Sequence, residues 1–118
     1  MRLPNSESVR IERQKVTEYL LNTTHRYGAS KARFFADFGF GPANWEELAA
    51  ALRAHARDNE VVRRKDTFFG PRFEVDGKLR TPSGERPIVR SVWQMDTGEI
   101  TPRLITVYPL EVEHDSGT

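Results

Sequence analysis

The sequence predicts an α+β fold, with N-terminal helices packed on one face of a four- or five-stranded antiparallel sheet. The first half of the 118 residues has the apolar spacing of helices, and the second half has β-rich segments separated by turn residues. Helices and strands are thus segregated along the chain, which favours an antiparallel sheet covered on one side. We expect a single domain over residues 1–110, followed by a flexible acidic tail over residues 111–118.

The helices are predicted from apolar spacing combined with end signals. Ser30 is a favourable N-cap, and Gly39 is a favourable residue just past a helix end. Asn44 and Glu47 have the spacing of a capping box, with asparagine in place of serine or threonine. The expected helices cover residues 13–22, 30–39 and 44–58.

The strands are predicted from β-rich runs bounded by turn signals. Asp76-Gly77 is a strong hairpin signal, and Ser83-Gly84 indicates a second turn. Trp93 is expected in the core. The expected strands cover residues 61–68, 72–75, 78–81, 87–95 and 103–108.

The side chains of the last expected strand, residues 103–108, alternate between two faces of the sheet. Because side chains alternate along a strand, Ile105 and Val107 share one face, and we assign them to the helix-covered side. Leu104, Thr106 and Tyr108 then point to the open side, where polar atoms can reach a ligand.

Composition limits the classes of function. The chain has no cysteine, which excludes disulfides, zinc–thiolate sites and cysteine nucleophiles. It has no apolar run near the roughly 18 residues of a membrane span and no signal peptide. We therefore expect a cytoplasmic protein without membrane contact, or a module exported within a larger chain.

The net charge is only +1, but it is unevenly spread. Residues 1–59 carry +2, residues 60–93 carry +3 and residues 94–118 carry −4. This excess is too small for a typical DNA-binding domain, so nucleic-acid binding requires a local site.

A candidate local site lies in the segment from His25 to Lys31. Histidine changes charge near neutral pH, and lysine is a compact cation suited to a phosphate. Gly28 lies between them, where the chain enters a helix whose first N–H groups can bind an anion.

Five motifs are spread over nearly the whole chain. They are Leu3-Pro4-Asn5, Tyr19-Leu20-Leu21-Asn22, His25-x-x-Gly28-x-Ser30-Lys31-Ala32-x-Phe34-Phe35, Val89-x-x-Val92-Trp93 and Pro102-Arg103-Leu104-Ile105-Thr106-x-Tyr108-Pro109. Together they resemble an uncharacterised bacterial domain family, seen both as stand-alone proteins and as toxin modules of larger secreted proteins. More distantly, the architecture resembles the barnase–EndoU–colicin–RelE group of ribonuclease toxins, which implies metal-independent RNA cleavage.

This resemblance leads to the hypothesis of an endoribonuclease that uses no metal and no cofactor. A base activates the 2′-hydroxyl, an acid protonates the leaving 5′-oxygen, and cations stabilise the charge on the phosphoryl oxygens. We assign proton transfer to His25 and phosphate stabilisation to Lys31. Thr106 and Tyr108 would position the phosphate or supply the second proton. The further residues assigned to phosphate or RNA binding are Arg90 and Arg103.

Each assignment has a structural alternative. His25 can be a surface or capping residue, and Tyr108 can be a core aromatic with a solvated hydroxyl. Lys31 can be a solvated residue of a helix start, although a cation there opposes the helix dipole. Arg103 can protect a strand edge. His55 lies mid-helix and is assigned no role.

The hypothesis implies two partners, an RNA substrate (tRNA or mRNA) and a cognate antitoxin or immunity protein. The alternative is a non-catalytic binding module, itself immunity-like or a partner subunit, that uses the open sheet face. A third option is a sensor of phosphate or a small molecule at the same site.

Overall fold

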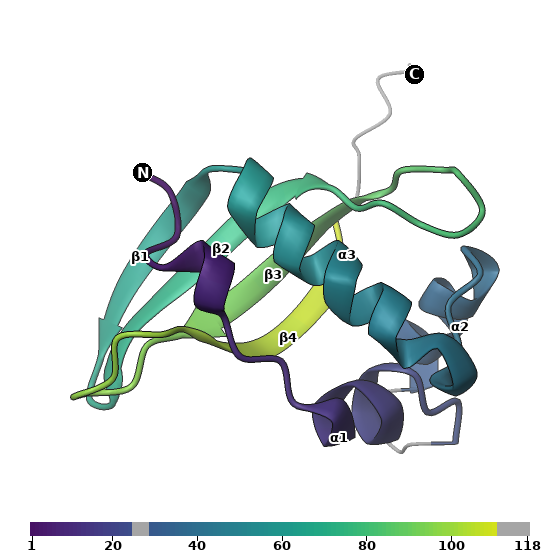
Figure 1. Cartoon of the computed structure of the whole chain (residues 1–118), viewed down its shortest axis with the longest axis horizontal. Coiled ribbons are helices and arrows are strands. Elements are labelled where there is room, and N and C mark those ends of the chain that lie inside the picture. Colours follow the sequence, from purple (N-terminus) through teal and green to yellow (C-terminus); the bar gives the residue numbers. More distant parts are fainter. Residues whose placement is uncertain (25–28, 111–118) are drawn as a thin grey trace.

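The computed structural model describes residues 1–24 and 29–110. Helical segments come first, then a four-stranded antiparallel sheet of order β1-β2-β3-β4, which confirms the predicted α+β class. The long helix α3 crosses one face of the sheet, and α1 and α2 lie together near one of its ends (Figure 1). The elements are η1 (Ser6–Ser8), α1 (Arg13–Lys15), η2 (Val16–Leu20), α2 (Ala29–Asp37), η3 (Pro42–Asn44), α3 (Trp45–Asp58), β1 (Val61–Thr67), β2 (Gly70–Lys78), β3 (Ile88–Gln94) and β4 (Arg103–Pro109).

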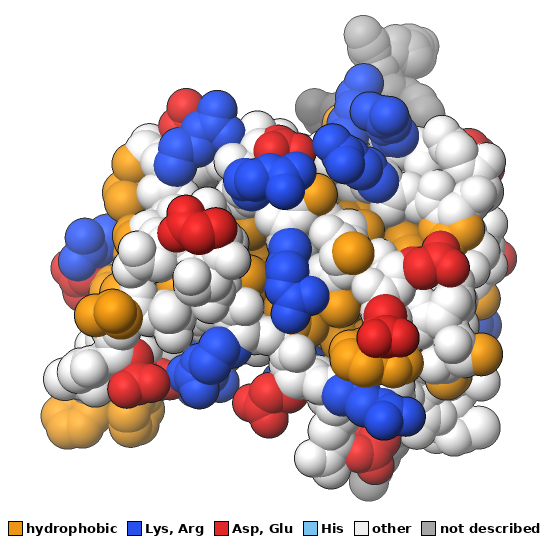
Figure 2. All heavy atoms as spheres, in the orientation of Figure 1, with side chains coloured by type: hydrophobic (Ala, Val, Ile, Leu, Met, Phe, Trp, Pro, Cys, Tyr) orange, Lys and Arg blue, Asp and Glu red, His pale blue; other side chains and the backbone are white. Residues whose placement is uncertain are grey.

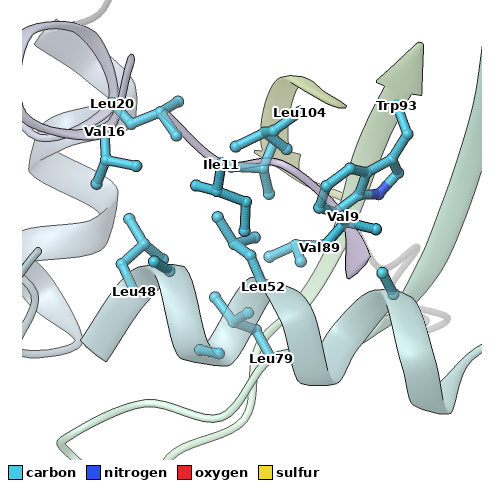
Figure 3. Close-up of a cluster of buried hydrophobic side chains, with 14 of the residues drawn as sticks. Val9, Ile11, Val16, Leu20, Leu48, Leu52, Leu79, Val89, Trp93 and Leu104 are labelled. Carbon is cyan, nitrogen blue, oxygen red and sulfur yellow. The ribbon is translucent and has the colours of Figure 1, made fainter. Parts of the chain in front are cut away.

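The core lies between α3 and the covered face of the sheet. Leu48 and Leu52 of α3 are fully buried, as is Trp93 of β3, the last as predicted. Val9 and Ile11 of the N-terminal segment join the same cluster (Figure 3). This apolar layer holds α3 on one face of the sheet, and α3 does not cover the opposite face.

The predicted hairpin at Asp76-Gly77 is wrong. Strand β2 runs straight through it, with Asp76 opposite Arg90 and Gly77 opposite Val89 of β3. A Cβ on Gly77 would lie only 2.2 Å from the side chain of Asn59, so the glycine makes room for α3's end rather than for a turn. The two short strands expected at 72–75 and 78–81 are therefore replaced by one strand.

The predicted capping box at Asn44 is also wrong. The Asn44 side chain makes no cap hydrogen bond to α3. Instead, its Oδ1 accepts from the backbone N–H of Gly41 at 2.7 Å and its Nδ2 donates to the carbonyl of Gly39 at 3.1 Å. The asparagine thus stabilises the turn between α2 and α3.

A β-bulge in β4 corrects the face assignment of Leu104. Val92 pairs with Thr106, but the next residue, Trp93, pairs with Leu104, so Ile105 is an extra residue in β4. Leu104 consequently points into the core beside Val107 and is 3% exposed, rather than lying on the open face. Ile105, which was assigned to the core, is half-buried.

Candidate functional site

The candidate site centres on Lys31 in the first turn of α2. The Nζ of Lys31 donates to the Thr106 hydroxyl of β4 at 2.9 Å and to the Tyr19 hydroxyl of η2 at 3.1 Å. These residues are far apart in the sequence, and the fold brings them together at the edge strand of the sheet. Two of the predicted site residues, Lys31 and Thr106, are therefore in direct contact.

Two aromatic rings complete the surroundings of the ammonium group. The Nζ of Lys31 lies 5.1 Å from the ring centroid of Tyr19 and 6.0 Å from that of Tyr108, both within cation–π range. Tyr108 thus joins the same group, as predicted from the alternation of β4. We call Tyr19, Lys31, Thr106 and Tyr108 the Lys31 group; all four side chains are half-buried.

The charge of Lys31 has no acidic partner among the described residues. The ion pairs of residues 1–24 and 29–110 leave it out, and its two hydrogen-bond acceptors are neutral hydroxyls. An ammonium group has three N–H donors, and described residues accept from two of them. Within the described part of the chain, the Lys31 group therefore presents a cation without a carboxylate partner and one N–H donor that can bind an anion.

The backbone explains how the group forms. The bulge at Ile105 puts Leu104 in the core and still leaves Thr106 and Tyr108 together on the other face. Tyr19 comes from η2, a π-helical turn in which the N–H of Leu21 donates to the carbonyl of Val16 at 2.8 Å. Such π-turns are rare and occur often at functional sites. Helical spacing does not reveal a π-turn, so the sequence alone gives Tyr19 no place in this site.

Arg90 lies opposite Tyr108 on β3, but its guanidinium is bound by carboxylates. It makes two bonds to Asp76, at 2.7 and 2.8 Å, and lies 3.2 Å from Glu74. The hydrogen bonds that Arg90 donates to Asp76 raise the pKa of Arg90, with a smaller contribution from Tyr108. Any phosphate at Arg90 would compete with two carboxylates.

Arg103 lies apart from Lys31, at the beginning of β4. Its Nε donates to Asp96 at 2.7 Å and its terminal nitrogen to the other oxygen at 3.3 Å. These bonds raise the pKa of Arg103 and lower that of Asp96. No contact among the described residues joins Arg103 to the Lys31 group. His25 lies outside the described residues.

His55 forms a second polar group, buried between α3 and the sheet. Its Nε2 lies 3.1 Å from the carbonyl of Gly77 and 3.2 Å from that of Val89, so this nitrogen carries the proton. Its Nδ1 then accepts from the Ser91 hydroxyl at 2.9 Å, and Ser91 accepts from the Trp93 indole N–H at 2.8 Å. Burial lowers the pKa of His55, which favours this neutral form. Both ring nitrogens are thus used in hydrogen bonds that join α3 to the sheet.

Comparison with known proteins assigns the chain to a family. The model of a family described as a domain of unknown function (DUF6883) matches residues 2–111. The chain belongs to this family. No curated protein matches the sequence.

The fold of this DUF6883 domain is similar to that of a solved structure. The similar chain belongs to the contact-dependent growth inhibition toxin–immunity protein complex from Klebsiella pneumoniae 342, with a TM-score of 0.68 and 18% identity. The match covers 85% of this chain and 98% of that chain. At this identity the likeness concerns the fold, and the resemblance to the barnase–EndoU–colicin–RelE group stays a prediction.

The described residues also lack two other kinds of site. No helix in the described part of the chain is both long and apolar enough to cross a membrane. Within residues 1–24 and 29–110, no three His, Cys, Asp or Glu side chains group in a way that could hold a metal ion.

Proposed function

We propose that this domain is a metal-independent endoribonuclease toxin, controlled by a cognate immunity protein or antitoxin. The observation that supports it best is the Lys31 group, where a cation without a described carboxylate partner meets hydroxyls from η2 and β4. The similar fold of one chain of a toxin–immunity complex supports a toxin role for this chain as well.

In this proposal Lys31 stabilises the charge that grows on the phosphoryl oxygens as the 2′-hydroxyl attacks. A positioned cation is worth most at that step, because the negative charge is greatest in the transition state. The Thr106 hydroxyl accepts from Lys31, so its own proton points elsewhere and can hold a second phosphoryl oxygen. His25 and Tyr108 are assigned to the two proton transfers.

The test uses purified protein and a labelled RNA in the presence of a chelator. Wild type should give products ending in a 2′,3′-cyclic phosphate, and a single 2′-deoxy substitution at the cut site should abolish cleavage. Lys31→Ala should lower the cleavage rate by about 100- to 1,000-fold, as expected for loss of one group that stabilises the transition state.

Lys65→Ala is the matched control, because Lys65 is an exposed lysine on β1. It should cleave as wild type does. If wild-type protein leaves RNA intact and is harmless when expressed in a bacterium, the ribonuclease proposal is wrong.

A binding module is the second candidate, because the similar complex contains an immunity protein as well as a toxin. In that case the Lys31 group would bind an acidic side chain of a partner. Harmless expression, intact RNA and a stable complex that Lys31→Ala disrupts would favour this function.

A further inference from the structure

A second site lies on the opposite side of the sheet from the Lys31 group's open face, in a cavity of about 410 Å³. It is formed where the C-terminal half of α3 faces the end of β2 and the start of β3. Lys and Arg side chains gather on this part of the surface (Figure 2). The lining residues that matter for binding are Ala51, Ala54, Asp58, Lys78, Arg86 and Ile88.

One wall of the cavity is basic. Arg80 lies 3.5 Å from Asp58, which also binds Arg57. Lys78 and Arg86 form no ion pair with any described residue. Three lining cations thus face one lining carboxylate, and that carboxylate is already paired, which leaves two exposed cations for an anion.

The other wall is apolar and smooth. Ala51 and Ala54 lie one turn apart on α3, and Ile88 begins β3. The two alanines are only 7% and 8% exposed, so the wall is fixed by the core, whereas Ile88 is 37% exposed. Ile88 therefore supplies most of the apolar surface that a flat ring can cover, and the small alanine side chains leave room beside it.

We propose that this cavity binds a nucleotide, with its phosphate between Lys78 and Arg86 and its base against Ala51, Ala54 and Ile88. The volume lies within the usual range for small-molecule sites, which are mostly apolar with a few placed polar groups. An acidic side chain of a partner protein would use the cations but would leave the apolar wall uncovered. The proposal does not depend on ribonuclease activity, because Lys31 does not line this cavity.

The test measures binding of AMP, adenosine and inorganic phosphate to the full chain by calorimetry. AMP should bind at least about tenfold more tightly than either fragment, because only AMP contacts both walls. The Lys78→Ala/Arg86→Ala double variant should weaken AMP binding by at least about tenfold, since it removes both charge-assisted contacts. Arg63→Ala/Lys65→Ala is the matched control and should bind as wild type does, because both residues are exposed on β1.

A second variant, Ala54→Leu, keeps every charge and fills the apolar wall. It should abolish AMP binding while inorganic phosphate binding is unchanged, with circular dichroism confirming the fold. Phosphate binding as tight as AMP binding, equal weakening by the control pair, or no AMP binding at millimolar concentration would each overturn the proposal. None of these results depends on whether the protein cuts RNA.

Discussion

Lys31 and Arg90 are two cations that both lie beside Tyr108, and they differ in the charges around them. Lys31 is held by the hydroxyls of Tyr19 and Thr106, whereas Arg90 is held by the carboxylates of Asp76 and Glu74. A cation that is already paired has little attraction left for a phosphate, so two cations beside the same tyrosine differ in what they can bind.

The difference arises from strand register rather than from the local sequence of either cation. Asp76 and Glu74 reach Arg90 because β2 pairs with β3, with Asp76 directly opposite Arg90. Lys31 comes from helix α2 and contacts the side chain of Thr106 on β4, and no described residue brings a carboxylate to it. The role of Arg90 in phosphate binding stays a prediction, which these carboxylates oppose.

The largest effect is expected from giving Lys31 the kind of partner that Arg90 has. Thr106→Asp places a carboxylate where the hydroxyl now accepts from Lys31. If the free charge of Lys31 drives RNA cleavage, this substitution should lower the rate about 100-fold, because it removes the electrostatic stabilisation of the phosphoryl oxygens. Cleavage of a labelled RNA under single-turnover conditions measures the change.

Thr106→Asn is the matched control, since it has the shape of aspartate without the charge. It should keep activity within about tenfold of wild type, because Lys31 retains its charge and a neutral acceptor. Equal rates for the aspartate and asparagine variants would show that shape, not charge, matters at residue 106.

A smaller effect, on stability, is expected to be larger for Arg90 than for Lys31. Arg90→Met leaves Asp76 and Glu74, whose side chains are 23% and 18% exposed, without their common partner. The free energy of unfolding should fall by about 2 kcal/mol, less than for a fully buried pair. Lys31→Met breaks no ion pair with a described residue and should change it by about 0.5 kcal/mol or less.

Urea unfolding followed by tryptophan fluorescence measures both variants, because Trp93 is fully buried. Should Lys31→Met prove as destabilising as Arg90→Met, Lys31 would be a structural residue, and the contrast between the two cations would fail.

The sequence predicts the fold well because its signals are local and agree. Helical spacing in the first half and β-rich runs in the second are enough for the α+β class. Asp76-Gly77 misleads because a turn signal cannot report a neighbouring helix, and here the glycine accommodates Asn59.

The candidate site is predicted only in part, since it depends on irregular backbone. Alternation places Thr106 and Tyr108 correctly, but it fails at Leu104 because one extra residue in β4 reverses the pattern. Tyr19 is missed as a partner of Lys31, because its position follows from a π-turn. The ion pairs of Arg90 with Asp76 and Glu74 are missed because they depend on the register between β2 and β3, which the sequence does not reveal.

The smallest expected effect is a pH dependence of stability that comes from His55. It tests whether burial, rather than the lack of a carboxylate partner, decides if a basic side chain carries a charge. The ring nitrogens of His55, like the ammonium group of Lys31, form hydrogen bonds with neutral oxygens of described residues, but His55 is 2% exposed. Burial lowers the pKa of His55 below its usual 6.5, so between the two values the unfolded chain binds a proton that the folded chain does not. The contribution to stability is therefore complete above about pH 6.5 and is lost as pH falls below it. Urea unfolding across pH 5–7 should show this decline in wild type, and His55→Gln should flatten it because glutamine does not titrate. If the free energy of unfolding declines with equal slope in both proteins, the decline comes from other titrating groups. Burial would then not be the property that distinguishes His55 from Lys31.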